Sequence, residues 1–483
     1  MTSSAGDLSD VSDLPVLLPS TRRALLHRVA AAQAAGRVPS LTAAVQREGR
    51  VVWSGARGAA IGGRVPDVDV QYRIGSITKT FTAVLVMRLR DEGLLDLADP
   101  LEKHLPGTGV GEVTVYQLLG HTAGLAAETP GPWWERTPGE LRPGLGDVLG
   151  GVRAESTRPR PAGRVHHYSN PGYTLLGSLV EAVRGVSWAE AVRREITEPL
   201  GLTRTSAQPQ SPYAEGWAVH PWADVLLAEP VEDLGLMAPA GQLWSTVGDL
   251  CRFGAFLAAG DERVLSRESV REMRVPAAPL EAGGWSVTYG LGVQVLRVGG
   301  RELVGHGGSL PGFVAGLWVD AADGVAAAAL ANATSGTAAG SLATELVCLV
   351  AEAEPRIAEV WQPLAEKDVH QELLELTGAW YWGTVPYGLR LLAGRGVSLE
   401  RLDGGTGRGS RFRAGPDGTW VGLDGYYAGE TLRVVRGPGG AAGAAKGAVS
   451  HLDLGSFVFT REPYEAGAAI PGGVDEGGWR GVG

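Results

Sequence analysis

Apolar residues in the first 355 positions recur with two spacings, which predict a mixture of helices and strands. A spacing of three to four residues predicts helices at residues 20–36, 76–91, 245–257 and 336–352. Short apolar runs predict strands at residues 41–46, 51–54, 289–298, 301–305, 313–320 and 325–332. Strands at both ends with helices between them predict one α/β domain whose first and last segments share an antiparallel sheet.

The pattern changes after residue 355. A charged connecting stretch covers residues 356–371, and the short β-like runs that follow it are separated by Gly, Pro and Asp turns. These runs predict a small antiparallel β domain, either a barrel or a sandwich, with strands at residues 380–382, 389–392, 410–413, 420–421, 431–435 and 456–459. We therefore expect an N-terminal tail at 1–19, a catalytic domain at 20–355, a linker at 356–371 and a β domain at 372–483.

Composition narrows the class of protein. The 483 residues are 44% hydrophobic and 20% charged with a net charge of −10, which argues against nucleic acid or an anionic membrane as the main partner. No apolar stretch approaches the roughly 18 residues of a membrane span, and residues 1–13 lack the features of a signal peptide. We expect a cytoplasmic protein. Cys251 and Cys348 lie far apart in helix-like stretches and predict buried free thiols.

Ser76 and Lys79 are the first candidates for chemistry. They lie three residues apart at the start of a predicted helix, so they share one face and the serine sits at the positive end of the helix dipole. A serine hydroxyl needs a neighbouring group to take its proton, and a partly desolvated lysine serves this purpose. The alternative is a helix cap beside a surface lysine.

Two further patterns point to the same chemistry. Tyr168 and Asn170 precede a predicted helix, for which the alternative role is an Asx-type cap. His306, Gly308 and Ser309 follow the strand predicted at 301–305. An edge strand that ends in small residues approaches a substrate closely, and its N–H groups complete an oxyanion hole with the N–H of Ser76.

In chain order, Ser-x-x-Lys, Tyr-x-Asn and His-x-Gly resemble the three motifs of the serine penicillin-recognising enzymes, nearest to class C β-lactamases, D-Ala-D-Ala carboxypeptidases and their esterase relatives. Leu118–Leu125 and Pro239–Thr246 resemble two further elements of that family. The resemblance covers residues 20–355 and implies an antiparallel sheet with flanking helices and an all-helical lobe. His306 stands where most β-lactamases have lysine, which argues against efficient lactam hydrolysis.

The resemblance implies a serine acyl-transfer enzyme without metal or cofactor. Ser76 attacks a peptidyl carbonyl, and Lys79 and Tyr168 manage its proton, with the choice of base between them open. The N–H groups of Ser76 and Ser309 hold the oxyanion beside Gly308, Asn170 orients the acyl amide, and His306 faces the leaving group or a carboxylate. Trp133 and Trp134 form an aromatic wall of the cleft or, alternatively, an exposed loop packed on the core.

The β domain directs the choice of reaction. Gly378-Ala-Trp380 resembles the opening of a lipocalin-type barrel, and a penicillin-binding-type core joined to such a domain resembles the penicillin-binding-protein-type thioesterases. The resemblance implies release and head-to-tail cyclisation of a nonribosomal peptide with a D-residue at its C-terminus, delivered by a carrier protein of the synthetase. The alternatives are a D-stereospecific peptidase, esterase or β-lactamase-like hydrolase, and a non-catalytic sensor of peptides or β-lactams.

Overall fold

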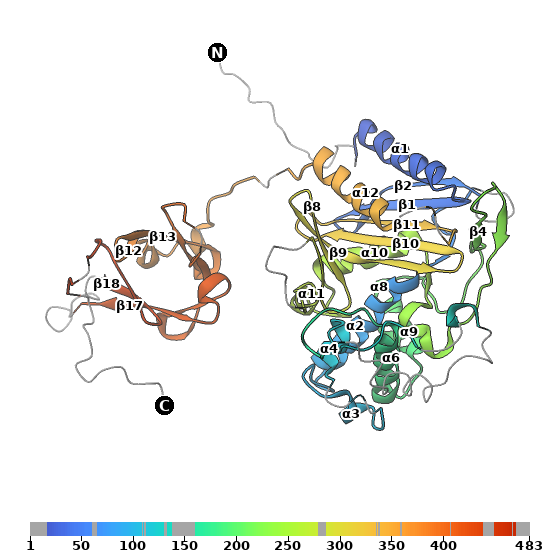
Figure 1. Cartoon of the computed structure of the whole chain (residues 1–483). Coiled ribbons are helices and arrows are strands. Elements are labelled where there is room, and N and C mark those ends of the chain that lie inside the picture. The colour runs from blue at the N-terminus through green and yellow to red at the C-terminus, as the bar shows by residue number, and fades with distance from the viewer. Residues whose placement is uncertain are drawn as a thin grey trace, which may run out of the picture. The chain divides into compact units, whose positions relative to one another are not determined.

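The chain forms two compact units, Met1–Ile357 and Ala358–Gly483 (Figure 1). The computed structural model describes residues 17–59, 65–108, 110, 113–129, 133–137, 160–278, 286–334, 336, 339–357, 360–405, 407–437, 449–465 and 467–469. Most of the tail expected at residues 1–19 lies outside these described residues.

The first unit is built on a seven-stranded sheet in the order β2-β1-β11-β10-β9-β8-β7, in which every neighbouring pair is antiparallel. The strands are β1 (Ser40–Arg47), β2 (Arg50–Gly58), β7 (Val287–Tyr289), β8 (Gln294–Val298), β9 (Arg301–Leu310), β10 (Phe313–Asp320) and β11 (Val325–Ala331). The first and last parts of the domain meet where β1 pairs with β11. The structure therefore confirms the α/β fold expected from the strand pattern.

Both faces of the sheet are covered by helices, with α1 (Pro19–Ala35) and α12 (Ala339–Ala353) on one face and α10 (Val247–Ala259) on the other (Figure 1). Strand β11 is buried along its whole length. Because successive side chains of a strand point to opposite faces, it contributes alternate residues to the hydrophobic cores on the two faces of the sheet. The residues on the α1 and α12 side are Val325, Ala327, Ala329 and Ala331; those on the α10 side are Ala326, Ala328 and Leu330. Mostly alanine side chains let helices pack closely on both faces.

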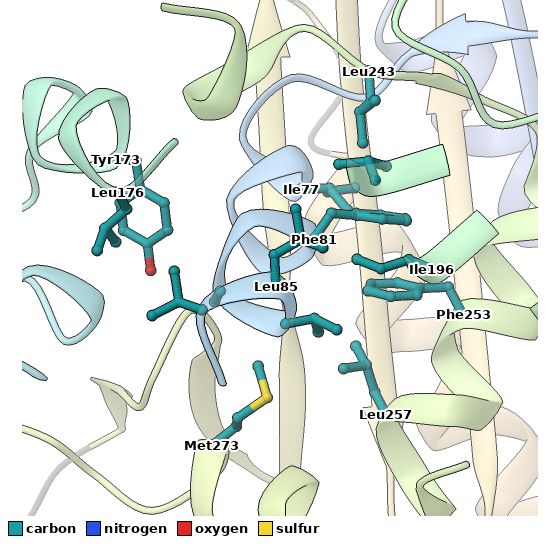
Figure 2. Packing of buried hydrophobic residues seen from close by; sticks show 14 of the residues in the cluster. Ile77, Phe81, Leu85, Tyr173, Leu176, Ile196, Leu243, Phe253, Leu257 and Met273 are labelled. Carbon is teal, nitrogen blue, oxygen red and sulfur yellow. The ribbon is translucent and has the colours of Figure 1, made fainter. Parts of the chain in front are cut away.

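A helical lobe surrounds the central helix α2 (Thr78–Asp91), which is buried almost throughout. Phe81 of α2 stacks on Phe253 of α10 with ring centroids 3.9 Å apart, which joins the lobe to the sheet (Figure 2). The other helices among the described residues of the unit are α3 (Leu101–His104), α4 (Val115–Leu119), α6 (Asn170–Arg184), α7 (Trp188–Val192), α8 (Glu198–Leu200), α9 (Ala238–Gly241) and α11 (Arg267–Met273). They are joined by the 3-10 turns η2 (Gly75–Ile77), η3 (Trp134–Arg136) and η7 (Gly235–Met237) and by the π-helix η6 (Arg193–Thr197). Two small ladders pair β3 (Tyr72–Arg73) with β6 (Trp244–Ser245), and β4 (Trp217–Val219) with β5 (Leu226–Ala228).

Some element boundaries differ from the prediction. The single strand expected at 289–298 is two strands, because Gly292 at φ +80° reverses the chain between β7 and β8. The strand expected at 301–305 runs on to Leu310 as β9. The helix expected from Ser245 begins at Val247, since Ser245 pairs in β6 and the side chain of Thr246 caps the helix.

The second unit is a closed barrel of eight strands, β12 to β19, in which each strand pairs antiparallel with the next and β12 with β19. The strands are β12 (Gly378–Trp382), β13 (Val385–Leu391), β14 (Val397–Arg401), β15 (Ser410–Ala414), β16 (Trp420–Gly422), β17 (Thr431–Arg436), β18 (Val449–Leu454) and β19 (Phe457–Thr460). Short helices α13 (Gln371–Leu374), η8 (Glu366–Asp368), η9 (Ala393–Arg395), η10 (Pro416–Gly418) and η11 (Gly425–Tyr427) accompany them. The barrel is confirmed over the sandwich; β14 and β18 were not expected because polar residues interrupt their apolar runs.

One end of the barrel is held by a tryptophan and an arginine. Trp380 is fully buried, and its indole N–H donates to the carbonyl of Leu376 over 2.7 Å. The guanidinium of Arg461 lies 3.9 Å from the Trp380 ring and donates to the carbonyl of Thr377 over 2.9 Å. This packing explains why a Gly-x-Trp sequence opens the barrel.

Across the described parts of the chain, every helix is too short or too polar to cross a membrane. Both cysteines are free: Cys251 is buried in α10, and Cys348 is partly exposed in α12. The expected buried thiol is therefore found at Cys251 but only in part at Cys348.

We expect Trp380→Ala to destabilise the barrel by about 3–5 kcal/mol, because the change removes a fully buried indole together with its contact to the Arg461 guanidinium. Trp361→Ala is the matched control in the same unit, since the Trp361 side chain is 83% exposed. Calorimetry of the full chain measures both variants. The same small shift for Trp380→Ala and Trp361→Ala would contradict the role of Trp380.

Candidate active site

Ser76 lies in the turn η2 that leads into α2, with its side chain partly exposed. The backbone N–H of Ile74 donates to the carbonyl of Leu243 over 2.9 Å and fixes the start of this turn. Gly75 has φ +51°, which a residue with a side chain rarely adopts. The serine hydroxyl is thus presented to solvent from a rigid, buried backbone.

Lys79 points back along α2 toward Ser76 and is fully buried. Its Nζ lies 3.0 Å from Oγ of Ser76, 2.6 Å from Oδ1 of Asn170 and 2.8 Å from the carbonyl oxygen of Ala240. Burial lowers the pKa of Lys79 to about 7, an effect that the negative charges of Glu128 and Glu135 only partly oppose. A neutral Lys79 amine can donate to Asn170 and Ala240 and still accept the proton of Ser76.

Tyr168 lies just before α6, and its ring centroid is 4.8 Å from Nζ of Lys79. Burial raises the pKa of the Tyr168 phenol, although its hydrogen bond to Ser76 acts in the opposite direction. The phenol therefore holds its proton at neutral pH. Of the two groups beside Ser76, Lys79 is the one whose pKa suits a base at neutral pH.

Asn170 is the first residue of α6, and its side chain bridges Lys79 and Glu128. Its Oδ1 accepts from Lys79, and its Nδ2 donates to Glu128 over 2.6 Å. The cap of α6 is Ser169, whose hydroxyl accepts from the N–H of Gly172 over 3.1 Å. The Asx-cap alternative for Asn170 is therefore wrong.

The strand β9 supplies the other wall of the site. Its residues up to Gly305 pair with β8, whereas residues 306–310 extend past β8 and pair with β10 alone. The free edge packs against η2 so closely that a Cβ on Gly308 would lie 1.9 Å from the carbonyl oxygen of Ile74 and 3.1 Å from the nitrogen of Ser76. A Cβ on Gly75 would lie 2.5 Å from the nitrogen of Ser309. The two N–H groups expected to hold an oxyanion thus belong to adjoining backbone segments.

His306 lies inside β9 rather than after its end, and its ring is buried. Nδ1 contacts the carbonyl of Gly307, which can only accept, so Nδ1 carries the proton and Nε2 accepts from the hydroxyl of Tyr289 over 3.0 Å. Burial, aided by the charge of Lys79, lowers the pKa of His306 to about 3. At neutral pH the ring is uncharged and both nitrogens are engaged, so it brings no positive charge for a substrate carboxylate.

The two tryptophans have different surroundings. Trp134 is buried with Leu310, the last residue of β9, and its indole N–H donates to Glu128 over 2.8 Å. Trp133 is 55% exposed, donates to Glu135 over 2.8 Å and stacks under the guanidinium of Arg136 at 4.6 Å. Trp134 therefore joins the site through Leu310 and Glu128, and Trp133 lies at its exposed margin.

Three residues beside the site were not singled out from the sequence: His121, Glu128 and Tyr289. His121 accepts from the N–H of Ser169 over 3.1 Å, and its ring centroid lies 4.3 Å from that of Tyr168. His121 belongs to the family-like element at residues 118–125, so this element could have indicated its place in the site. Glu128 lies in no predicted element, and Tyr289 begins the strand predicted at 289–298. Neither position shows from the sequence that the residue reaches the site, because that depends on how distant segments pack.

Comparisons with known proteins agree with this fold and geometry. The family model described as Beta-lactamase matches residues 26–352, and one described as a domain of unknown function, DUF7586, matches residues 369–461. The chain is 31% identical over 322 residues to Penicillin-binding protein 4 of Amycolatopsis lactamdurans, which covers 62% of this chain and 81% of that protein.

Two solved structures are similar as well. A D-stereospecific amidohydrolase from Streptomyces sp. has a TM-score of 0.56 and 29% identity, covering 70% of this chain and 99% of the other. SurE has a TM-score of 0.56 and 26% identity, covering 92% and 99%.

The fold and the arrangement of Ser76, Lys79 and Tyr168 define the class of penicillin-recognising serine proteins. The chain belongs to the β-lactamase family, with a closed eight-stranded barrel at its C-terminal side.

We expect Gly308→Ala to abolish acylation of Ser76, because the added Cβ would force β9 away from η2. Gly307→Ala is the matched control: its Cβ would lie no nearer than 3.9 Å to the carbonyl oxygen of Ala315. Labelling with a serine-reactive fluorophosphonate measures both. Equal labelling of the two variants would contradict the close approach of the two backbones.

The rate of this labelling should depend on pH through Lys79. The neutral amine is the form that accepts a proton, so the rate should rise about tenfold per pH unit below pH 7 and level off above it. Lys79→Ala should lose this inflection together with most of the rate. A rate that keeps rising to pH 10 would mean that Lys79 is not the base.

Proposed function

We propose that this protein is a serine acyl-transferase that releases a peptide from a thioester and closes it head to tail. The observation that carries the proposal is the 3.0 Å contact between Oγ of Ser76 and Nζ of Lys79, whose pKa is lowered to about 7. In the first step Oγ bonds to the peptidyl carbonyl carbon and its proton passes to the neutral Nζ. The carbon–sulfur bond then breaks, and the sulfur takes a proton from Lys79 or Tyr168, so that the leaving group departs as a thiol.

The other groups serve the same intermediate. The N–H groups of Ser76 and Ser309 stabilise the oxyanion, and the protonated phenol of Tyr168 donates to Oγ or to the leaving group. Asn170 holds Lys79 through Oδ1 and orients the acyl amide. Because these groups act on a carbonyl through hydrogen bonds, esters and amides are accepted by the same geometry.

The charges around Ser76 favour a substrate with an amino group. Glu128 is exposed beside Asn170, and Glu135 lies at the adjacent turn η3, while the nearby His306 is neutral. Burial raises the pKa of Glu135, and its charge and that of Glu128 repel one another. An ammonium group between these carboxylates would relieve that repulsion. A substrate carboxylate would add to it, which disfavours a carboxypeptidase.

Cyclisation uses the same amino group as the second nucleophile. The N-terminal ammonium first loses one proton to solvent. The resulting amine attacks the acyl carbon and gives a proton to Lys79, which passes it to Oγ of Ser76 as the bond between Oγ and the acyl carbon breaks. A held amine has an effective molarity of about 10⁵ to 10⁸ M, which is enough to compete with water at about 55 M. A D-residue at the acylating position is supported by the likeness to a D-stereospecific amidohydrolase and to SurE, which was also solved with D-Leu.

The second candidate is a D-stereospecific peptidase or amidase, in which water resolves the acyl-enzyme. The same carboxylates favour it, since such a substrate also carries an ammonium group beside the scissile bond. A carrier protein of a nonribosomal peptide synthetase is the proposed donor only in the cyclase.

The test uses peptidyl thioesters that differ only in the chirality of the last residue, with products separated by mass. We expect an acyl adduct on Ser76, none in Ser76→Ala, faster turnover of the D substrate, and a cyclic product lighter than the acid by one water. Linear acid alone would leave the D-stereospecific hydrolase, and equal rates for D and L would remove the stereochemical assignment. Absence of any adduct in the unaltered protein would favour a sensor.

Glu128→Gln separates the amine contact from the acyl chemistry. We expect a roughly tenfold lower kcat/KM for substrates with a free amine and little change for the same peptides after N-acetylation. An equal loss for both sets would mean that Glu128 acts only by positioning Asn170.

A further inference from the structure

A cavity of about 870 Å³ lies in the first unit, away from Ser76, and six of the residues that line it are arginines. They are Arg252, Arg263, Arg267, Arg271, Arg274 and Arg356. Alanines and glycines of α10 and of the turns β1–β2 and β10–β11 make up much of the remaining wall. The cavity is positively charged in a chain whose net charge is −10.

The cavity belongs to the opposite end of the sheet from the candidate active site. Strand β10 begins at Phe313, which pairs with Leu310 beside Ser309, and ends at Asp320, next to the cavity wall at Ala321. Seven residue steps along a strand span roughly 24 Å. An occupant of this cavity is therefore not the group attacked by Ser76.

Among the residues that the structure describes, two carboxylates line the cavity, and each already has an arginine partner. Glu48 contacts Arg356 at 3.0 Å, and Asp261 contacts Arg263 at 2.6 Å. Among the described residues, no carboxylate lies within ion-pair distance of Arg267, Arg271 or Arg274. Half of the arginines that line the cavity thus lack an acidic partner there.

These three arginines come from one short segment around α11, so their charges lie close together. Arg274 is partly buried; its Nη2 donates to the carbonyl of Ala258 over 2.8 Å, while its Nε is buried without a hydrogen-bond partner. Burial and the charges of Arg271 and Arg267 lower the pKa of Arg274, and Glu302 opposes them. A buried guanidinium with an unused donor beside two like charges is a costly arrangement that a bound anion would relieve.

We propose that this cavity binds a small molecule that carries two or more phosphate groups. Guanidinium groups bind phosphate oxygens in pairs, and three unpaired arginines exceed what one phosphate needs. The volume falls in the range of small-molecule sites. The negative net charge of the chain disfavours a long polyanion such as nucleic acid, whose phosphates extend beyond the cavity.

The test is calorimetric titration of the full chain with inorganic pyrophosphate and tripolyphosphate at low salt. Sulfate, which is a single tetrahedral anion, serves as the comparison. We expect one site, tighter binding of the oligophosphates than of sulfate, and an affinity that falls with salt. Titration with ATP distinguishes a nucleotide from a free oligophosphate. Absence of binding at millimolar pyrophosphate, or equal affinity for sulfate, overturns the proposal.

Arg271→Gln is the decisive variant, because Arg271 is exposed and its guanidinium forms no ion pair with a carboxylate of the described residues. We expect pyrophosphate affinity to fall at least tenfold, with no loss of Tm in the free protein and unchanged labelling of Ser76. Arg23→Gln on α1 removes the same charge from an exposed site and should bind as the unaltered protein does. An equal fall in both variants would mean unspecific attraction and overturn the site.

Discussion

Removal of the Lys79 ammonium from water is the constraint on which the candidate active site depends. Lys79 is fully buried, and within the described part of the chain no carboxylate contacts it directly. Its hydrogen-bond partners there are a hydroxyl, an amide oxygen and a backbone carbonyl. A carboxylate in contact would keep the lysine charged, whereas neutral acceptors hold it in place and leave its pKa near 7. The rings of Tyr168 and Tyr173 lie 4.8 Å and 5.8 Å from Nζ of Lys79 and are part of what buries it.

This buried lysine would be of no use without the approach of β9 to η2. Glycine at 75 and at 308 lets two backbones meet where side chains would separate them. The approach also requires β9 to extend past β8, so that its last residues keep one edge free of the sheet. The same extension buries His306 against Tyr289. The neutral state of this histidine and the open edge of the strand are therefore two results of one feature of the sheet.

Local patterns were enough to predict the fold and to select most of the residues around Ser76. Helical spacing predicted α2, and the Ser76–Lys79 pair followed from that helix alone. The residue type of His306 did not predict its charge. His306 was expected to face the leaving group or a carboxylate, but burial lowers its pKa, and its ring contacts Tyr289 of another strand. Glu128 reaches Asn170 only through tertiary packing. Strands β14 and β18 were not predicted from the sequence, because the buried residues Ser398 and His451 are polar and interrupt the alternation of apolar residues.

The charges of the first unit are separated along the sheet, and this separation constrains what each end can bind. Carboxylates Glu128 and Glu135 lie by Ser76, whereas arginines without acidic partners lie beyond the far end of β10. The carboxylates beside Ser76 repel an anion and attract a cation. The arginines of the cavity attract an anion and repel a cation. Salt weakens both preferences, because Glu128 and Arg271 are exposed. The proposed substrate with an amino group at Ser76 and the proposed phosphate-bearing ligand at the opposite end both agree with this charge distribution.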